Sequence, residues 1–394
     1  MRRARRSLLL SVFGALFASA SLVKPIAVLR VTNLDANGPG SLRQAVATPG
    51  PRLVVFEVGG VIDLGGESLS IREPELTLAG QTAPDPGITL VRGGLAVETH
   101  DVVIEHIAVR PGDGARGAPD ALGAHGRGVY NVLFDHCSAT WGIDENLSVS
   151  GPADADPAAT ARDVTIRSCL IAEGLSHAGH PKGEHSKGTL IHDSVRGVTI
   201  VGCLYAHNRE RNPRLKGGTR AVVAQNVMYN WGSACVGVGA RGNQKMLAPA
   251  EAVIVDNVAI AGPDTHGKVF VKSVDPGGRV YLRGNVVDVR LADDGVVQLS
   301  GLPSWASLPA KAGDVLRTAG ARPARRDPID ARIVQSVIDR TGRIIDSQEQ
   351  VGGYPVRPMT RRALVVPEDA VARQRWLDRL AAELNASPSP DSQE

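Results

Sequence analysis

Seven stretches decide the fold of this chain: DVVIEHI (101–107), NVLFDHC (131–137), DVTIRSC (163–169), GVTIVGC (197–203), RAVVAQN (220–226), EAVIVDN (251–257) and RVYLRGN (279–285). Their starts lie 30, 32, 34, 23, 31 and 28 residues apart. Each stretch is a short alternating run rich in Val and Ile, which is typical of a β-strand. Self-similarity at this period indicates coils stacked along one axis. The sequence therefore predicts an all-β protein, a parallel β-helix.

The seventh position of the motif predicts what fills the core behind these strands. It holds Cys137, Cys169 and Cys203 in three successive copies. Side chains stacked in line about 4.8 Å apart suit disulfide geometry poorly, so we expect an apolar core stack. Later copies place asparagine there, at 226, 257 and 285. We expect these amides to form a hydrogen-bonded ladder along the axis.

Composition and charge limit the classes of ligand. The chain has 394 residues, 43% of them hydrophobic and only 4% aromatic, so stacking of neutral sugars on many rings is not expected. The net charge is +3, but residues 1–20 hold four arginines and no acid, so the remainder carries −1. Binding to nucleic acid through overall charge is therefore not supported.

The first twenty residues have the pattern of an export signal. Four arginines precede an apolar run from Leu8 to Phe17, and Ala18-Ser19-Ala20 provides a small-residue cleavage site. The run is of secretory length and short for a membrane span. We expect residues 1–20 to be a signal peptide, the protein to be secreted, extracellular or periplasmic, without a membrane partner, and the chain to be a monomer.

Helical signals flank the repeats. Ser41 is suited to cap a short helix over 42–46 that covers the open end of the stack. The repeat fades near residue 300, and helical spacing returns at 328–341 and 367–386. We expect a catalytic β-helix over 21–300 and a C-terminal extension over 301–394 that packs on it, with residues 387–394 disordered.

Polar residues gather in the loops that follow four consecutive strands. Asp144 lies 13 residues into its copy of the motif and Arg211 lies 14 into its own, so the same corner is used two coils apart, about 10 Å along the axis. Asp120 and Lys187 lie 19 and 24 residues in, which places them further around the coil. Carboxylates on the earlier coils and cations on the later ones are thus expected along one wall.

Several separated motifs, in order, resemble the pectate lyase family. They are VTNLDANGPGSLR (31–43), AGQTAP (79–84), DHCSATWGIDE (135–145), HSKG (185–188), HNRERNPR (207–214) and, in the tail, DPIDAR (327–332) and GRIIDSQEQVGGYP (342–355). The resemblance implies a right-handed parallel β-helix that cleaves polygalacturonate, an acidic polysaccharide, by calcium-dependent β-elimination.

The resemblance also implies roles for individual residues. Asp120 and Asp144 match the calcium ligands, and Arg211, in its Arg-x-Pro context, matches the catalytic base. Lys187 matches a catalytic cation at the substrate carboxylate, and Lys216 and Arg214 match substrate-binding positions. A guanidinium rarely gives up its proton, so an arginine base predicts an alkaline optimum.

Three positions depart from the family pattern. Ala118 and Ser148 stand where the family often has further aspartates, so the calcium site would rely on the substrate, on Asp113 or on Glu145. Lys216 stands where arginine is usual, and a lysine cannot grip a carboxylate with two parallel hydrogen bonds.

Two other functions fit part of the same set of residues. A glycoside hydrolase would use Asp120 and Asp144 as its two carboxylates but would leave Arg211 and Lys187 unexplained. A non-catalytic carbohydrate-binding or adhesion β-helix would fit the losses at 118 and 148. The histidines at 177, 180 and 185 lack a fourth ligand within a glycine-rich loop, so zinc is not predicted there.

Overall fold

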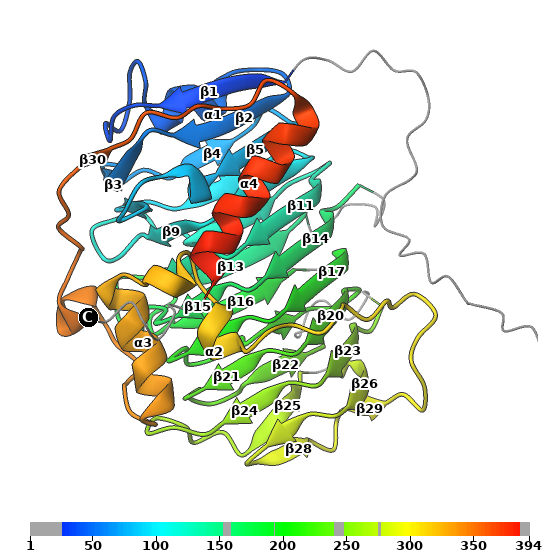
Figure 1. Cartoon of the computed structure of the whole chain (residues 1–394). Coiled ribbons are helices and arrows are strands. Elements are labelled where there is room, and N and C mark those ends of the chain that lie inside the picture. Colours follow the sequence, from blue (N-terminus) through cyan, green and yellow to red (C-terminus); the bar gives the residue numbers. More distant parts are fainter. Residues whose placement is uncertain (1–25, 153–158, 193, 240–247, 275–276, 387–394) are drawn as a thin grey trace, which may run out of the picture.

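The computed structural model describes residues 26–152, 159–192, 194–239, 248–274 and 277–386. Three sheets run the length of the molecule as walls of a stack of coils (Figure 1). Neighbouring strands pair in parallel in all three sheets, apart from the antiparallel pair of β3 and β30. Each coil contributes one strand to each wall, so the predicted parallel β-helix is confirmed.

The eleven-stranded sheet contains the repeated motif. Its strands are β1 (Ala27–Val31), β2 (Arg52–Phe56), β5 (Leu76–Ala79), β8 (Val102–Glu105), β11 (Tyr130–Asp135), β14 (Arg162–Arg167), β17 (Arg196–Val201), β20 (Arg220–Ala224), β23 (Glu251–Val255), β26 (Arg279–Arg283) and β29 (Val297–Gln298). The fourth motif position stays in register from Ile104 through Phe134 and Ile166 to Leu282. The alignment made on the sequence is therefore the pairing register.

The other two walls complete each coil. The nine-stranded sheet has β4 (Leu69–Ile71), β7 (Leu95–Val97), β10 (Leu122–His125), β13 (Glu145–Ser150), β16 (Lys187–Ile191), β19 (Arg214–Leu215), β22 (Val236–Val238), β25 (Val269–Ser273) and β28 (Arg290–Ala292). The ten-stranded sheet has β30 (Thr360–Arg361), β3 (Val58–Asp63), β6 (Ile88–Val91), β9 (Ile107–Arg110), β12 (Ser138–Thr140), β15 (Leu170–Ala172), β18 (Leu204–Ala206), β21 (Val227–Tyr229), β24 (Val258–Ile260) and β27 (Val286–Val287).

A single left-handed residue turns the chain from the eleven-stranded wall into the ten-stranded wall. It is always the sixth motif position, from His106 (φ 57°) and His136 (φ 47°) to Gly284 (φ 65°). Positive φ is strained for most side chains and free for glycine. This explains why polar residues and glycine, and no β-branched residue, occupy the position in all seven copies.

The interior matches the expected core. Cys137, Cys169 and Cys203 are fully buried free thiols within the main apolar cluster. Below them the Nδ2 atom of Asn226 donates to Oδ1 of Asn257 at 2.9 Å, and Asn257 donates to Asn285 at 2.9 Å. The amide ladder continues the stack and satisfies its own polar atoms, as the sequence predicted.

Helices lie outside the walls. The helix α1 (Leu42–Ala47) is capped by Ser41, as predicted. The tail contains α2 (Val315–Thr318), α3 (Pro328–Ile338), α4 (Ala370–Asn385) and the short 3-10 turns 323–325 and 348–351, and a third such turn, 80–82, follows β5. The last two predicted helices thus form but are shorter: α3 begins behind its Asp327 cap as predicted and stops at Ile338, and α4 begins only after its Asp369 cap.

The tail packs on two walls. Helices α2 and α3 cover the outer face of the ten-stranded sheet, where Ile333 and Val337 join Trp141 and Leu204 in one apolar cluster. Helix α4 lies across the eleven-stranded sheet near its first strands, with Leu377 against Val55 (Figure 1). Among the described residues, the apolar clusters that these helices join contain no residue from a strand of the nine-stranded sheet.

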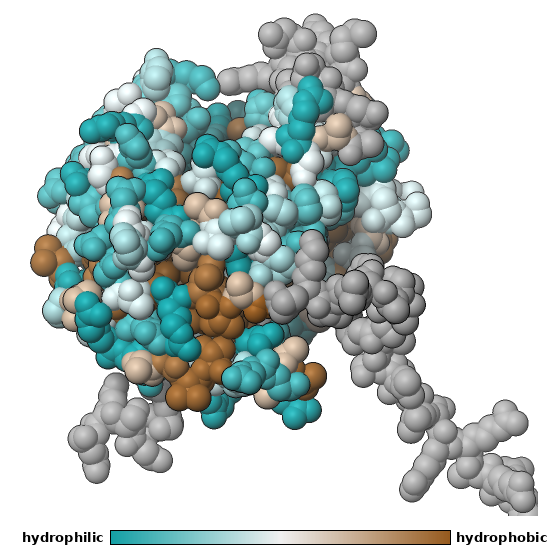
Figure 2. Space-filling view, turned by 90° about the horizontal axis from the view of Figure 1, so that it is seen from above, coloured by the Kyte–Doolittle hydropathy of each residue, from teal (hydrophilic) through white to brown (hydrophobic). Residues whose placement is uncertain are grey.

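The end of the stack that carries β1 and α1 is mostly hydrophilic, with apolar side chains gathered in one area of the face (Figure 2). Within the described residues, no helix is both long enough and apolar enough to cross a membrane. The signal peptide predicted for residues 1–20 and the disorder predicted for residues 387–394 concern segments outside the described residues.

Candidate active site

The predicted site residues converge where the chain enters the nine-stranded sheet. Asp120 comes just before β10, Asp144 just before β13, Lys187 begins β16 and Arg211 comes just before β19. Because these strands are successive neighbours in the sheet, the four residues follow one another along a single corner. Asp144 and Arg211 are two coils apart, as predicted.

The expected positions of Asp120 and Lys187 further around the coil were wrong. Offsets counted from the motif include the loop between the second and third wall, and this loop differs in length from coil to coil. After β12 it has four residues, 141–144, but after β15 it extends from Glu173 to Ser186. The strand that follows, rather than the residue count, fixes the corner.

Three carboxylates meet at this corner. Single oxygens of Asp120, Asp144 and Glu145 all lie within 4.8 Å of one another. Oδ1 of Asp120 accepts from the Glu145 amide at 2.9 Å, and its Oδ2 accepts from the Ser148 hydroxyl. Burial raises the pKa of Asp120 to about 6, and the negative charge of Asp144 adds to the shift against the opposing effect of His125. Three carboxylates beside the guanidinium of Arg211 give this cluster a net negative formal charge.

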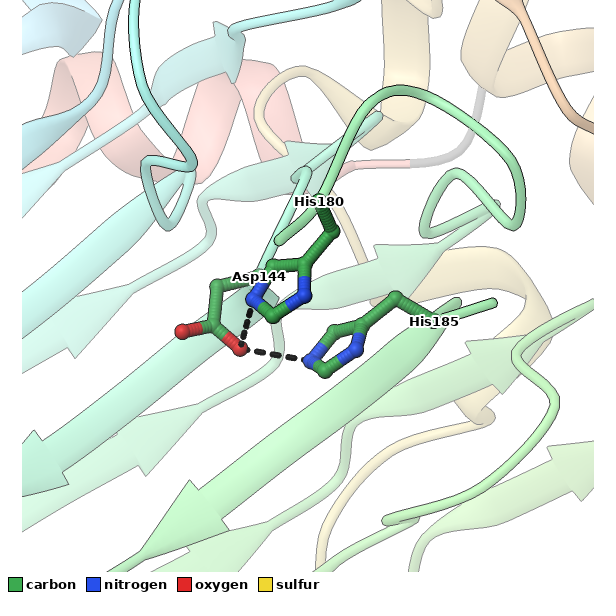
Figure 3. Close-up of side chains that lie close together, drawn as sticks. All are labelled: Asp144, His180 and His185. Atoms are coloured by element: carbon green, nitrogen blue, oxygen red, sulfur yellow. Dashed lines mark hydrogen bonds and ion pairs between the residues drawn. The ribbon is translucent and has the colours of Figure 1, made fainter. Parts of the chain in front are cut away.

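Asp144 has a different environment. Its Oδ1 atom lies 2.6 Å from Nε2 of His185 and 3.5 Å from Nε2 of His180 (Figure 3). Burial alone would raise the pKa of Asp144, but the hydrogen bond from His185 and the electrostatic effects of His185, His180 and Arg211 lower it. Its side chain is 30% exposed, the most open of the three carboxylates with Asp120 at 15% and Glu145 at 4%.

The two predicted catalytic cations are each paired with a glutamate. Arg211 contacts Glu145 through its guanidinium, and Nζ of Lys187 donates to Glu210 at 3.0 Å. Lys187 is only 8% exposed, and Arg211 is 20% exposed.

Arg214 and Lys216 lie further along the same wall. Leu215 between them is in the core, so both point outward from the nine-stranded sheet. Nζ of Lys216 lies 3.1 Å from Nε2 of His192, which directly follows β16, and Arg214 is 9% exposed. The structure thus extends the positive side of the site beyond Arg211.

An amide network that the sequence did not predict supports the corner from behind. Nδ2 of Asn146 donates to Asn208 at 2.9 Å, and Asn208 donates to Asn212 at 3.1 Å. Oδ1 of Asn146 also accepts from the Gly142 amide at 2.9 Å. These residues are buried, and each lies within two residues of Asp144 or within three of Arg211. Their signal was present as asparagines in buried corners, but the variable loops obscured their register.

Other polar residues of the first two loops have structural contacts. Both carboxylate oxygens of Asp113 accept from Ser347 and Gln348 in the tail, so this alternative metal ligand lies outside the cluster. Trp141 is fully buried and donates to Glu173 at 3.0 Å, as expected of a residue that packs a corner. Glu145 remains as the third carboxylate.

Calcium fits the oxygen-only part of the cluster. Hard divalent cations take carboxylate oxygens as ligands, and Asp120, Asp144 and Glu145 bring three of them within reach of one ion. Burial raises the pKa of Asp120 to about 6, and a bound cation would favour its ionised form.

Comparisons with known proteins identify the family. No protein-family model matches the chain. It is 30% identical over 345 residues to a probable pectate lyase C of Emericella nidulans, across 82% of this chain and 74% of the relative. The chain belongs to the pectate lyase family.

Two further relationships define how far the likeness goes. A probable pectate lyase C of Aspergillus flavus is 35% identical over 262 residues, which cover 66% of this chain and 55% of the relative. The match thus spans about half the length of that pectate lyase. A solved pectate lyase bound to a hexasaccharide shares the fold, with a TM-score of 0.52, 14% identity, and coverage of 75% of this chain and 92% of the other.

Proposed function

We propose that the chain is an exported pectate lyase that cleaves polygalacturonate by calcium-dependent β-elimination. The observation that supports it most is the convergence of Asp120, Asp144 and Glu145 beside Arg211, at the corner where the chain enters the nine-stranded sheet. The family, named above, supports the same reaction. Export rests on the leader at residues 1–20.

The site has the charges that this elimination needs. Removal of the C5 proton of a galacturonate places a second negative charge beside its carboxylate, so that carboxylate must first be neutralised. Asp120 and Asp144, with Glu145 as third ligand, would hold the calcium ion, and that ion would supply this neutralisation. Lys187, Arg214 and Lys216 hold the remaining carboxylates of the polymer along the wall.

Arg211 is the proposed base, and its contact with Glu145 is central to that role. The left-handed backbone at Arg211 (φ 64°) and the Asn146–Asn208–Asn212 network fix its position. A neighbouring carboxylate stabilises the protonated guanidinium, which must lose a proton before it can act as a base, so the base is available only when Glu145 is engaged elsewhere. This predicts activity that rises at alkaline pH and depends on occupation of the carboxylate cluster.

The direct test is absorbance of polygalacturonate digests with and without added calcium. A lyase leaves an unsaturated product that absorbs in the ultraviolet, and chelation should abolish the signal. Reducing ends without this absorbance would assign the chain as a glycoside hydrolase, with Asp120 as its acid. Binding of the polymer without either product would assign a non-catalytic carbohydrate-binding protein.

A further inference from the structure

The long loop between β15 and β16 brings two imidazoles onto Asp144 (Figure 3). The rings of His180 and His185 stack with centroids 3.7 Å apart and planes 17° apart. Both Nε2 atoms face the same Oδ1 atom of Asp144, while its other oxygen points away from them. The arrangement joins residues from two coils that are 41 positions apart in sequence.

The donor set differs from that of the carboxylate cluster. One ligand atom from each of Asp144, His180 and His185 lies within 4.8 Å of the other two. Two imidazole nitrogens and one carboxylate oxygen are the three-ligand set that zinc uses where a fourth position stays open. Calcium takes oxygen ligands almost exclusively, whereas imidazole favours zinc, nickel and copper.

We propose that Asp144, His180 and His185 form a second metal site, selective for a borderline divalent transition metal such as Zn²⁺. Asp144 would serve both sites, with Oδ1 toward the imidazoles and its other oxygen on the side away from them. The proposal does not depend on the proposed lyase activity, since metal binding is measured without substrate.

Access and cost follow from the surroundings. The side chains of His180 and His185 are 4% and 3% exposed and that of Asp144 is 30% exposed, so an ion enters from the aspartate side. The Lys182 amide donates to Nδ1 of His180 at 3.0 Å, which leaves the ring proton on Nε2. Metal binding moves this proton to Nδ1 and breaks that hydrogen bond, so we expect an affinity below that of closed structural zinc sites.

The same loop contains a matched control. His177 is 60% exposed and lies 2.7 Å from Asp346 in the tail, outside the cluster. His177 is a histidine of the same loop and also has a carboxylate partner. It is not part of the group formed by Asp144, His180 and His185. Non-specific zinc binding to surface histidines would be affected equally by changes at 177 and at 180.

The test is a titration of the tag-free, metal-stripped chain with Zn²⁺ against a chromophoric chelator, and separately with Ca²⁺ by calorimetry. We expect one Zn²⁺ per chain, weakened at least about tenfold in His180→Ala, since even loss of a supporting contact costs about 10–100-fold. His177→Ala should bind Zn²⁺ like the wild type. Asp120→Asn should weaken Ca²⁺ binding and leave Zn²⁺ binding within about threefold.

Equal loss in His177→Ala and His180→Ala, or absence of Zn²⁺ binding by the wild type, would overturn the proposal. Thermal melting verifies that each variant is folded. Should His180→Ala fail to fold, anomalous diffraction from zinc-soaked wild-type crystals decides the matter. A peak between Asp144 and the two imidazoles supports the site, and its absence there refutes it.

Discussion

Two sets of charged side chains, both largely buried, are built for different purposes. At the interface with α3, Nη2 of Arg110 lies 2.8 Å from Asp327 and 2.8 Å from Asp330, and Arg332 grips Glu173 with two hydrogen bonds of 2.6 and 2.8 Å. We call these contacts the tail clamp. In the tail clamp each cation meets its carboxylates directly.

The active-site corner has the opposite balance. Three carboxylates converge on one another, and the guanidinium of Arg211 contacts Glu145, the most buried of them. Arg110 is fully buried, whereas Asp144 and Arg211 remain 30% and 20% exposed. A closed network fixes the tail, and an open cluster with surplus negative charge is left for a cation and an acidic polymer. The predictions below test this distinction.

The largest effect is expected on activity. Arg211→Ala should lower the rate of lyase product formation by about 10²–10⁴-fold, the range typical for loss of a positioned base, with the chain still folded. The measurement is ultraviolet absorbance of polygalacturonate digests, with a thermal melt for folding. Arg209→Ala is the matched control, because Arg209 lies in the same loop as Arg211 but pairs with Glu184. This variant should lower the rate less than about tenfold. Equal losses in both variants would contradict the assignment.

The tail clamp should respond in stability instead. Arg110→Met keeps the side-chain volume but leaves Asp327 and Asp330 buried without their cation, at a cost of about 3–5 kcal/mol in the free energy of unfolding. Urea unfolding measures it. Arg72→Ala, at an exposed ion pair with Glu98, should cost less than about 1 kcal/mol. A small effect of Arg110→Met would show that the tail is held by apolar packing alone.

The burial of Asp120 predicts that the free energy of unfolding depends on pH. The pKa of Asp120 is raised to about 6, chiefly by burial, whereas an unfolded aspartate titrates near about 4. The folded chain therefore holds this proton more tightly, and the stabilisation is complete below about pH 4 and lost as the pH rises through about 6. In calcium-free buffer, Asp120→Asn should exceed the wild type by about 1–3 kcal/mol at neutral pH and match it at pH 4.

Urea unfolding of both proteins across this pH range gives the difference directly. Saturating calcium should reduce it, because a bound cation favours the ionised aspartate. A difference that stays constant with pH would show that the pKa of Asp120 is not raised in the folded chain.

The smallest effect concerns the missing family aspartate. Ser148 already donates to Asp120, so Ser148→Asp adds a fourth carboxylate and should tighten calcium binding about tenfold, or about 1.4 kcal/mol. Calorimetry with Ca²⁺ measures the change. Ser150→Asp is the control, because Ser150 contacts His125 instead. Equal tightening in both variants would indicate a general charge effect rather than a ligand.

The sequence by itself determined the repeat and everything that follows from regular stacking. The fourth motif position gave the register, the sixth gave the left-handed corner and the seventh gave the cysteine stack and the Asn226–Asn257–Asn285 ladder. These features are predictable because strand alternation is local and each coil repeats the same contacts with its neighbours. The candidate residues Asp120, Asp144, Lys187 and Arg211 were also found from motifs.

Only the tertiary structure decided what those residues touch. Loops of unequal length enter the nine-stranded wall, so no sequence offset could place Asp120 and Lys187 at the corner of Asp144, pair Glu210 with Lys187, or bring His180 and His185 onto Asp144. The tail clamp joins residues 159 to 220 positions apart. Such contacts depend on where a whole loop or helix packs, and that packing is a property of the assembled coils rather than of any local pattern.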